Sequence, residues 1–190
     1  MKEKIRNVLT ESISIKQRIL EDEALIKTIE EVSKVCIEAL RADKKILLCG
    51  NGGSAGDAQH LAAEFSGRFY KDRDPLFAEA LHVNTSYLTA VANDYSYAQI
   101  YSRLVKAKGR DGDILIGIST SGNSENIVKA FEQAKTQGMI TVGLTGETGG
   151  KMKPVSDYLL NIPSTDTPRI QEAHITVGHI ICELVELELF

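Results

Sequence analysis

Three absences narrow what this chain of 190 residues can be. No apolar run approaches the about 18 residues that a membrane-spanning helix requires. The charged N-terminus, residues 1–6, does not have the pattern of a secretory signal peptide. No basic block occurs and the net charge is −4, which disfavours nucleic acid as the main partner. We therefore expect neither a membrane nor a nucleic-acid partner.

Cysteine is scarce. Cys36, Cys49 and Cys182 are odd in number, widely spaced and set in apolar surroundings, which is typical of reduced core thiols in a cytoplasmic protein. Apolar residues make up 43% of the chain and charged residues 25%, as in ordinary globular proteins. No internal repeat or low-complexity linker divides the chain, so we expect a single domain over residues 1–190.

The apolar pattern alternates between the strand and helix periods. We expect strands at 45–50, 78–83, 114–118, 141–145 and 158–162, with helices at about 3–20, 22–41, 58–69, 86–92, 97–108, from 125, and 169–189. This alternation predicts an α/β fold, a three-layer α/β/α flavodoxin-like arrangement with a five-stranded parallel sheet in the order 2-1-3-4-5.

The first 42 residues form an N-terminal helical pair that the sheet does not require. Their apolar stripes can pack within the chain or on another subunit, and the sequence leaves both alternatives open.

Two turns rich in glycine and hydroxyl side chains follow the first and third strands. The first is Asn51-Gly52-Gly53-Ser54, and the second contains Ser119, Thr120, Ser121 and Ser124. In the predicted strand order both turns lie at the switch point of the sheet, where ligands bind in open α/β proteins. Free N–H groups and the helix dipole favour a phosphate there, although a single turn of this kind can also be an ordinary helix cap. No lysine occurs in the second turn, so it is not a nucleotide P-loop.

The two turns together make the chain resemble the sugar isomerase (SIS) family, whose phosphosugar loop is similar to residues 118–124. Within this family it resembles the phosphoheptose isomerases. The matching segments are residues 49–54, 92–94 and 169–172, the spacing of His60, Glu64 and Arg68, and His179. The resemblance implies an aldose–ketose isomerase that converts sedoheptulose 7-phosphate to D-glycero-D-manno-heptose 7-phosphate through an enediol. This is the first step toward ADP- or GDP-heptose precursors of lipopolysaccharide or capsule.

Such a reaction needs a base that moves a proton between C1 and C2 and an acid/base group for the oxygens. The four-residue spacing predicts that His60, Glu64 and Arg68 share one helix face, so Glu64 is a credible base; the alternative is a surface carboxylate paired with Arg68. Periodicity does not choose between His174 and His179 on the last helix, and the resemblance implies His179. We interpret His82 as structural.

The resemblance also implies the rest of the site. Catalytic residues are Glu64 and His179. Zn²⁺ would be held by His60, Glu64, Gln171 and His179, a weak set on sequence grounds alone because glutamine is a poor zinc ligand. Expected substrate contacts are Asn51, Gly52, Gly53, Ser54, Glu64, Arg68, Asn93, Asp94, Ser119, Thr120, Ser121, Ser124 and Gln171.

The family resemblance further implies a homotetramer whose sites are built between subunits. Two alternatives stay open: a non-catalytic SIS scaffold that binds the replication initiator DnaA, and a phosphosugar-sensing domain. The first lacks equivalents of Glu64 and His179, and the second usually carries an added DNA-binding unit that is missing here. Some relatives have an aspartate just before the arginine at position 169, so Asp166 and Thr167 are not assigned to the site.

Overall fold

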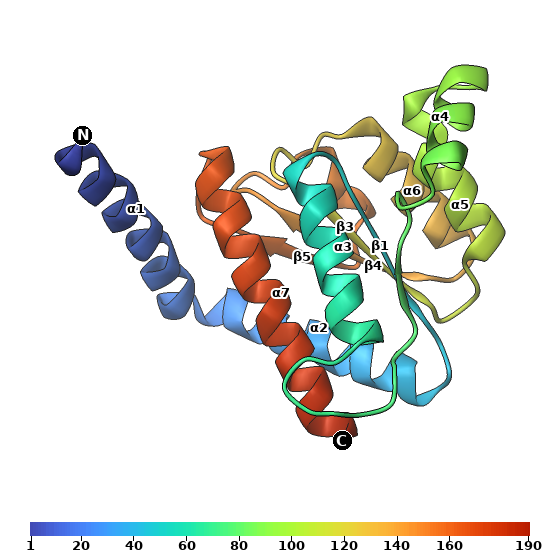
Figure 1. Ribbon diagram of the computed structural model, residues 1–190, viewed down its shortest axis with the longest axis horizontal. Coiled ribbons are helices and arrows are strands. Elements are labelled where there is room, and N and C mark those ends of the chain that lie inside the picture. Colours follow the sequence, from blue (N-terminus) through green and yellow to red (C-terminus); the bar gives the residue numbers. More distant parts are fainter.

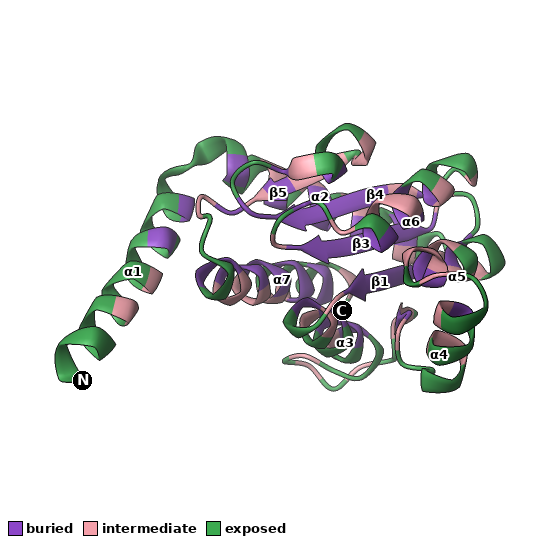
Figure 2. Ribbon diagram, turned by 90° about the horizontal axis from the view of Figure 1, so that it is seen from above, coloured by how far each residue is buried: buried purple, intermediate pink, exposed green.

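A parallel five-stranded sheet forms the centre of the computed structural model, which describes residues 1–190 (Figure 1). Its order is β2-β1-β3-β4-β5, as predicted. Every residue of β1 and β3 is buried, which explains why these strands are continuous apolar runs (Figure 2). The strands are β1 (Ile46–Gly50), β2 (Ala78–Ala80), β3 (Ile114–Ser119), β4 (Ile140–Thr145) and β5 (Tyr158–Asn161).

Helices cover both faces of the sheet and complete the three layers. Helices α2, α3 and α7 contribute to one hydrophobic core, and α4, α5 and α6 contribute to the other. The helices are α1 (Lys2–Glu21), α2 (Glu23–Arg41), α3 (Gly53–Ser66), α4 (Thr85–Asp94), α5 (Ile100–Lys108), α6 (Glu125–Thr136) and α7 (Thr167–Leu189), with short 3-10 helices η1 (Tyr97–Gln99) and η2 (Gly150–Val155). No helix combines the length and the apolar character needed to cross a bilayer.

The neighbouring strands β1 and β3 send their helices to opposite faces, because α3 packs in the first core and α6 in the second. The two polar turns therefore leave the same edge of the sheet at its switch point, as the sequence predicts.

The two N-terminal helices differ in their surroundings. Helix α2 packs along α7, and Asp22 caps its first turn by accepting hydrogen bonds from the N–H groups of Ala24 and Leu25. Helix α1 extends away from the body and is mostly exposed (Figures 1 and 2); only Ile15 and Ile19 are buried in it. Most apolar side chains of α2 are thus covered within the chain, whereas most of those on α1 are exposed.

Several predicted boundaries are wrong. Helix α3 covers 53–66 rather than 58–69: Gly52, at φ +55°, turns the chain straight from β1 into the helix, and Gly67 ends it. Strand β2 is an edge strand that pairs over only three residues. Helix α4 continues through Asp94 instead of breaking at Asn93, and α7 begins at Thr167, two residues early.

Candidate active site

The turn after β3 is a compact hydroxyl-lined loop. Ser119 Oγ and Ser124 Oγ lie 2.9 Å apart, and the N–H of Gly122 donates to the carbonyl of Ser119 at 2.9 Å. Gly122 has φ +65°, and an added Cβ would lie 2.1 Å from the carbonyl oxygen of Gly149. Glycine is therefore required here both for backbone conformation and for close packing against the segment that starts η2. We call residues 119–126 the cradle.

The cradle presents unpaired backbone donors. The N–H groups of Thr120, Ser121 and residues 124–126 donate to no protein acceptor, and α6 begins among them, at Glu125. These N–H groups, together with the positive end of the helix dipole, favour an anion. The arrangement supports the predicted phosphate site better than an ordinary cap, since Ser124 makes no side-chain cap bond to α6.

The turn after β1 is tied to the cradle. The side-chain amides of Asn51 and Asn126 exchange two hydrogen bonds of 2.9 Å, and the hydroxyl of Tyr97 donates to Asn51 Oδ1 at 2.9 Å. Asn51 thus joins the two turns instead of pointing freely into the site. Sequence reasoning missed Asn126 and Tyr97; a buried asparagine among the apolar residues of α6 is a usable signal, but no local pattern indicates Tyr97.

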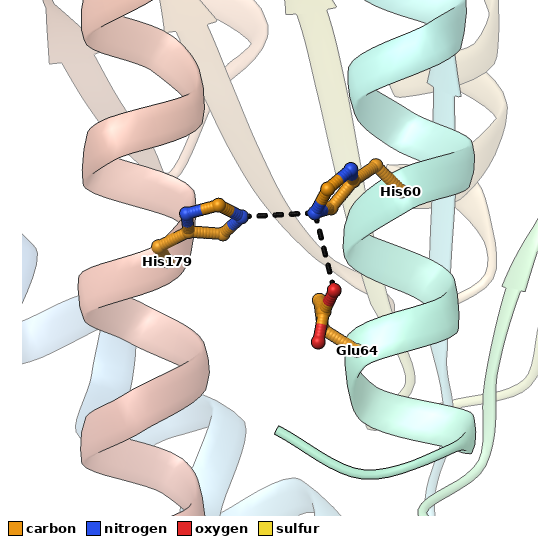
Figure 3. Close-up of side chains that lie close together, drawn as sticks. All are labelled: His60, Glu64 and His179. Carbon is orange, nitrogen blue, oxygen red and sulfur yellow. Dashed lines mark hydrogen bonds and ion pairs between the residues drawn. The ribbon is translucent and has the colours of Figure 1, made fainter. Parts of the chain in front are cut away.

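A second cluster lies between α3 and α7. His60 Nε2 is 3.1 Å from Glu64 Oε1 and 3.0 Å from His179 Nε2 (Figure 3). The four-residue spacing on α3 places His60 and Glu64 on one face, as predicted, and α7 supplies His179 from across the gap. The side chain of His60 is 49% exposed and that of Glu64 is 25% exposed, so solvent or a ligand can reach both. We call His60, Glu64 and His179 the trio.

His174 is not part of the trio. It is fully buried, and its Nε2–H donates to the carbonyl of Thr145 at the end of β4, 3.1 Å away. Burial lowers the pKa of His174 to about 4, so the ring is neutral near pH 7. The structure therefore gives His174 a packing role and settles, in favour of His179, which histidine of α7 faces Glu64. His82 follows β2, makes no hydrogen bond to the cradle or the trio, and burial lowers its pKa.

Gln171, near the start of α7, reaches the first turn of α3. Its Nε2 is 3.4 Å from Ser54 Oγ, and an added Cβ on Gly53 would be only 2.7 Å from the same nitrogen. Gln171 therefore packs on the first turn of α3. On its own helix, α7, it comes eight residues before His179, which is about 12 Å along the axis. The structure places it beside the predicted contacts Gly53 and Ser54, and its role as a metal ligand stays a prediction.

Three predicted substrate contacts make no hydrogen bond or ion pair to the trio or the cradle within the chain. The prediction that Arg68 shares the helix face of His60 and Glu64 is wrong, since α3 ends at Ser66 and Arg68 lies exposed in the following segment. Asn93 donates to Asp94 at 2.9 Å, and both are exposed at the end of α4.

The chemistry of the trio suits a metal ion. Its three ligand atoms lie within 4.8 Å of one another, and two imidazole nitrogens with one carboxylate oxygen form a donor set used by catalytic zinc. His60 Nε2 has room for a single proton, yet both Glu64 Oε1 and His179 Nε2 face it (Figure 3). A cation shared by the three atoms would satisfy all three lone pairs, which one proton cannot do equally well.

Comparison with known proteins assigns this architecture to a family. The model of the SIS domain matches residues 9–146. The phosphoheptose isomerase of Aneurinibacillus thermoaerophilus is 54% identical over 190 residues, covering 100% of this chain and 96% of the relative. The solved phosphoheptose isomerase of Neisseria gonorrhoeae is 42% identical with a TM-score of 0.92, covering 98% of each chain. That of Francisella tularensis is 36% identical with a TM-score of 0.93, covering 97% of each chain. The chain therefore belongs to the SIS family and is similar over its whole length to phosphoheptose isomerases.

Proposed function

We propose that the protein is a phosphoheptose isomerase, converting sedoheptulose 7-phosphate to D-glycero-D-manno-heptose 7-phosphate. The observation that carries this proposal is the convergence of Glu64 and His179 on one point between α3 and α7, in a fold that also has an anion cradle at its switch point. Relatives of the same name share about half of the residues over the full length. A scaffold without chemistry has no need for this convergence, so the enzyme is favoured over the DnaA-binding alternative.

The cradle is proposed to hold the phosphate. Its free N–H groups and the hydroxyls of Ser119, Thr120, Ser121 and Ser124 supply donors to the phosphate oxygens. The pair of Asn51 and Asn126 ties the turn before α3 to the cradle. From Ser54, in the first turn of α3, to His60 is six residues, about 9 Å along the helix. We propose that an extended seven-carbon sugar lies along this helix, with its phosphate in the cradle and its C1–C2 end at the trio.

Glu64 and His179 are proposed to carry the proton transfers. Glu64 Oε1 faces His60, which leaves Oε2 to take the proton from C1 of the ketose and return it to C2. His179 moves a proton from the C1 hydroxyl to the C2 oxygen, so that the carbonyl passes from C2 to C1 with no net gain or loss of protons. Both groups reach the same small volume, as a base and its proton shuttle must (Figure 3).

Zn²⁺ is proposed to bind His60, Glu64 and His179, with Gln171 as the fourth ligand that the family resemblance implies. When bound, the ion would supply Lewis acidity toward the sugar carbonyl, or order the trio. His60 then has a holding role, consistent with its place between the other two side chains. Metal analysis of purified protein, repeated after dialysis against a chelator, is expected to give about one zinc per chain that the chelator removes.

A homotetramer with sites shared between subunits is part of the proposal. Helix α1 exposes Ile5, Leu9 and Ile13, each more than half accessible, along a helix that projects from the body (Figure 1). An apolar stripe of this kind suits burial by a second copy. Arg68, Asn93 and Asp94 are exposed and would then be free to reach the site of a neighbouring subunit. Light scattering of the wild type and of Leu9→Glu tests this, since the variant should dissociate.

The proposed setting is the cytoplasm, which suits three buried free thiols; burial raises the pKa of Cys36 to about 12 and keeps it unreactive. There the product would feed lipopolysaccharide or capsule synthesis.

The direct test is incubation of purified protein with sedoheptulose 7-phosphate, with the aldose product followed by NMR. Turnover should appear, and inorganic phosphate should inhibit it competitively by occupying the cradle. Tight phosphosugar binding with no turnover would instead favour the sensing domain, and neither binding nor turnover would favour the scaffold.

A further inference from the structure

A buried carboxylate on α7, that of Glu186, binds the backbone of the segment that follows α3. Glu186 Oε2 accepts hydrogen bonds from the N–H groups of Tyr70 and Lys71 at 2.7 and 2.9 Å, and Oε1 accepts from the N–H of Phe69 at 3.0 Å. The Nε of Arg73 adds an ion pair to Oε1 at 2.9 Å. The side chains of Glu186 and Arg73 are 2% and 3% exposed, so both charges are withdrawn from water and fully bonded to each other and to the backbone.

The guanidinium of Arg73 caps the end of α3. Nη2 donates to the carbonyl of Glu64 at 2.9 Å, and Nη1 donates to the carbonyls of Phe65 and Gly67 at 2.9 and 3.2 Å. These carbonyls belong to the last turn of the helix and its C-cap, where no intrahelical N–H is available to them. Arg73 therefore bonds directly to the backbone of Glu64, the proposed base.

One ion pair thus connects the two helices that carry the trio. Glu186 lies seven residues after His179 on α7, which is two turns along the same face. The N–H that Phe69 donates to Glu186 also anchors the backbone of Phe69, whose ring centroid is 5.5 Å from that of His179. Arg73 and Glu186 together hold the backbone of Glu64, the spacing of α3 and α7, and the backbone of a residue whose ring packs on His179.

We propose that Arg73 and Glu186 are a positioning pair for the proton-transfer trio, so that the rate of the chemical step depends on an ion pair that never touches substrate. This inference rests on the proposed isomerase function. A displacement of about 1 Å between reacting groups can cost about 10²-fold in rate. The cradle lies at the opposite end of α3 and shares no bond with this pair, so substrate binding should depend on it little.

Two conservative variants and one matched control separate positioning from general stability. Arg73→Lys keeps the charge beside Glu186 but replaces the five-donor fork with one ammonium, which cannot also reach all the carbonyls of α3. Glu186→Gln keeps the shape but removes the charge and one acceptor oxygen. Arg41→Lys is the control. Arg41 on α2 forms an ion pair at 2.8 Å with Glu188, which lies on α7 as Glu186 does, but both side chains of this pair are exposed.

All four proteins are assayed with sedoheptulose 7-phosphate at a temperature where circular dichroism shows each of them fully folded. Arg73→Lys and Glu186→Gln should lower kcat about 10- to 100-fold while KM changes less than about threefold, and Arg41→Lys should match the wild type. A folded variant with wild-type kcat, or one in which KM alone rises, overturns the proposal, as does failure of both variants to fold. Absence of turnover in the wild type itself would reject the isomerase function, and this inference with it; turnover in the wild type with unchanged variants rejects the inference alone.

Discussion

His174 makes the stability of the protein depend on pH in a way that the structure predicts in size and sign. The ring is fully buried, and burial lowers its pKa from an ordinary 6.5 to about 4, while the bond to the Thr145 carbonyl only partly offsets this. The folded state therefore binds fewer protons at this site than the unfolded state does. A group of this kind contributes stability that is fully present above pH 6.5 and is lost as the pH falls toward 4.

The expected magnitude follows from the two pKa values. At about 1.4 kcal/mol per pKa unit, the shift from 6.5 to about 4 corresponds to a loss of about 3 kcal/mol in the free energy of unfolding when the pH falls from above 6.5 to below 4. Between pH 7 and pH 5 the loss should be about 2 kcal/mol, because at pH 5 the unfolded histidine is almost fully charged and the folded one is not. The substitution His174→Gln removes the titration and keeps an amide that can donate to Thr145.

The assay is urea unfolding of the wild type and His174→Gln at pH 7 and pH 5, at one protein concentration. The free energy of unfolding of the wild type should fall by about 2 kcal/mol more than that of the variant. All other ionisable groups are common to both proteins, so their contribution cancels in the difference. Equal losses in the two proteins would refute a buried neutral His174, and a larger loss in the variant would reverse the sign of the reasoning.

Two further substitutions test the cradle. Gly122→Ala should raise KM for the phosphosugar and lower Tm, because the added methyl group clashes with the Gly149 carbonyl and because Gly122 has φ +65°, where a side chain costs about 1–3 kcal/mol of strain. The control Gly56→Ala has open space around its Cβ and should leave KM unchanged. Ser124→Ala should raise KM and the inhibition constant of inorganic phosphate together, because it removes a hydroxyl of the phosphate site; a change in kcat alone would contradict that role.

The sheet could be predicted from sequence because its strands are local apolar runs. The buried segments over β1 and β3 and the polar turns after them predict both the strand order and the switch point. Helix ends were less predictable. The start of α3 depends on the φ of Gly52, and its end depends on Arg73, which comes seven residues after the last helical residue. Such contacts form only after the chain has folded.

The choice between His174 and His179 shows where a helical pattern stops being informative. Five residues on a helix differ by about 140° in direction, so only one of the two rings can face α3. Which one does depends on the rotation of α7 against the sheet, and that rotation comes from tertiary packing. The pair of Arg73 and Glu186 is 113 residues apart in the chain, and no local spacing indicates it.

Proton exchange in Glu64→Gln tests the central claim, that the trio performs an aldose–ketose isomerisation, most directly. The variant keeps the shape of the side chain and loses the base, so turnover of sedoheptulose 7-phosphate should fall by about 10²–10⁴-fold, and incorporation of solvent tritium at C1 should be abolished. His179→Gln, the matched variant on α7, should lose turnover but retain some exchange, since Glu64 can still remove the carbon proton. Near wild-type turnover in Glu64→Gln, or exchange that survives in it, would contradict the account.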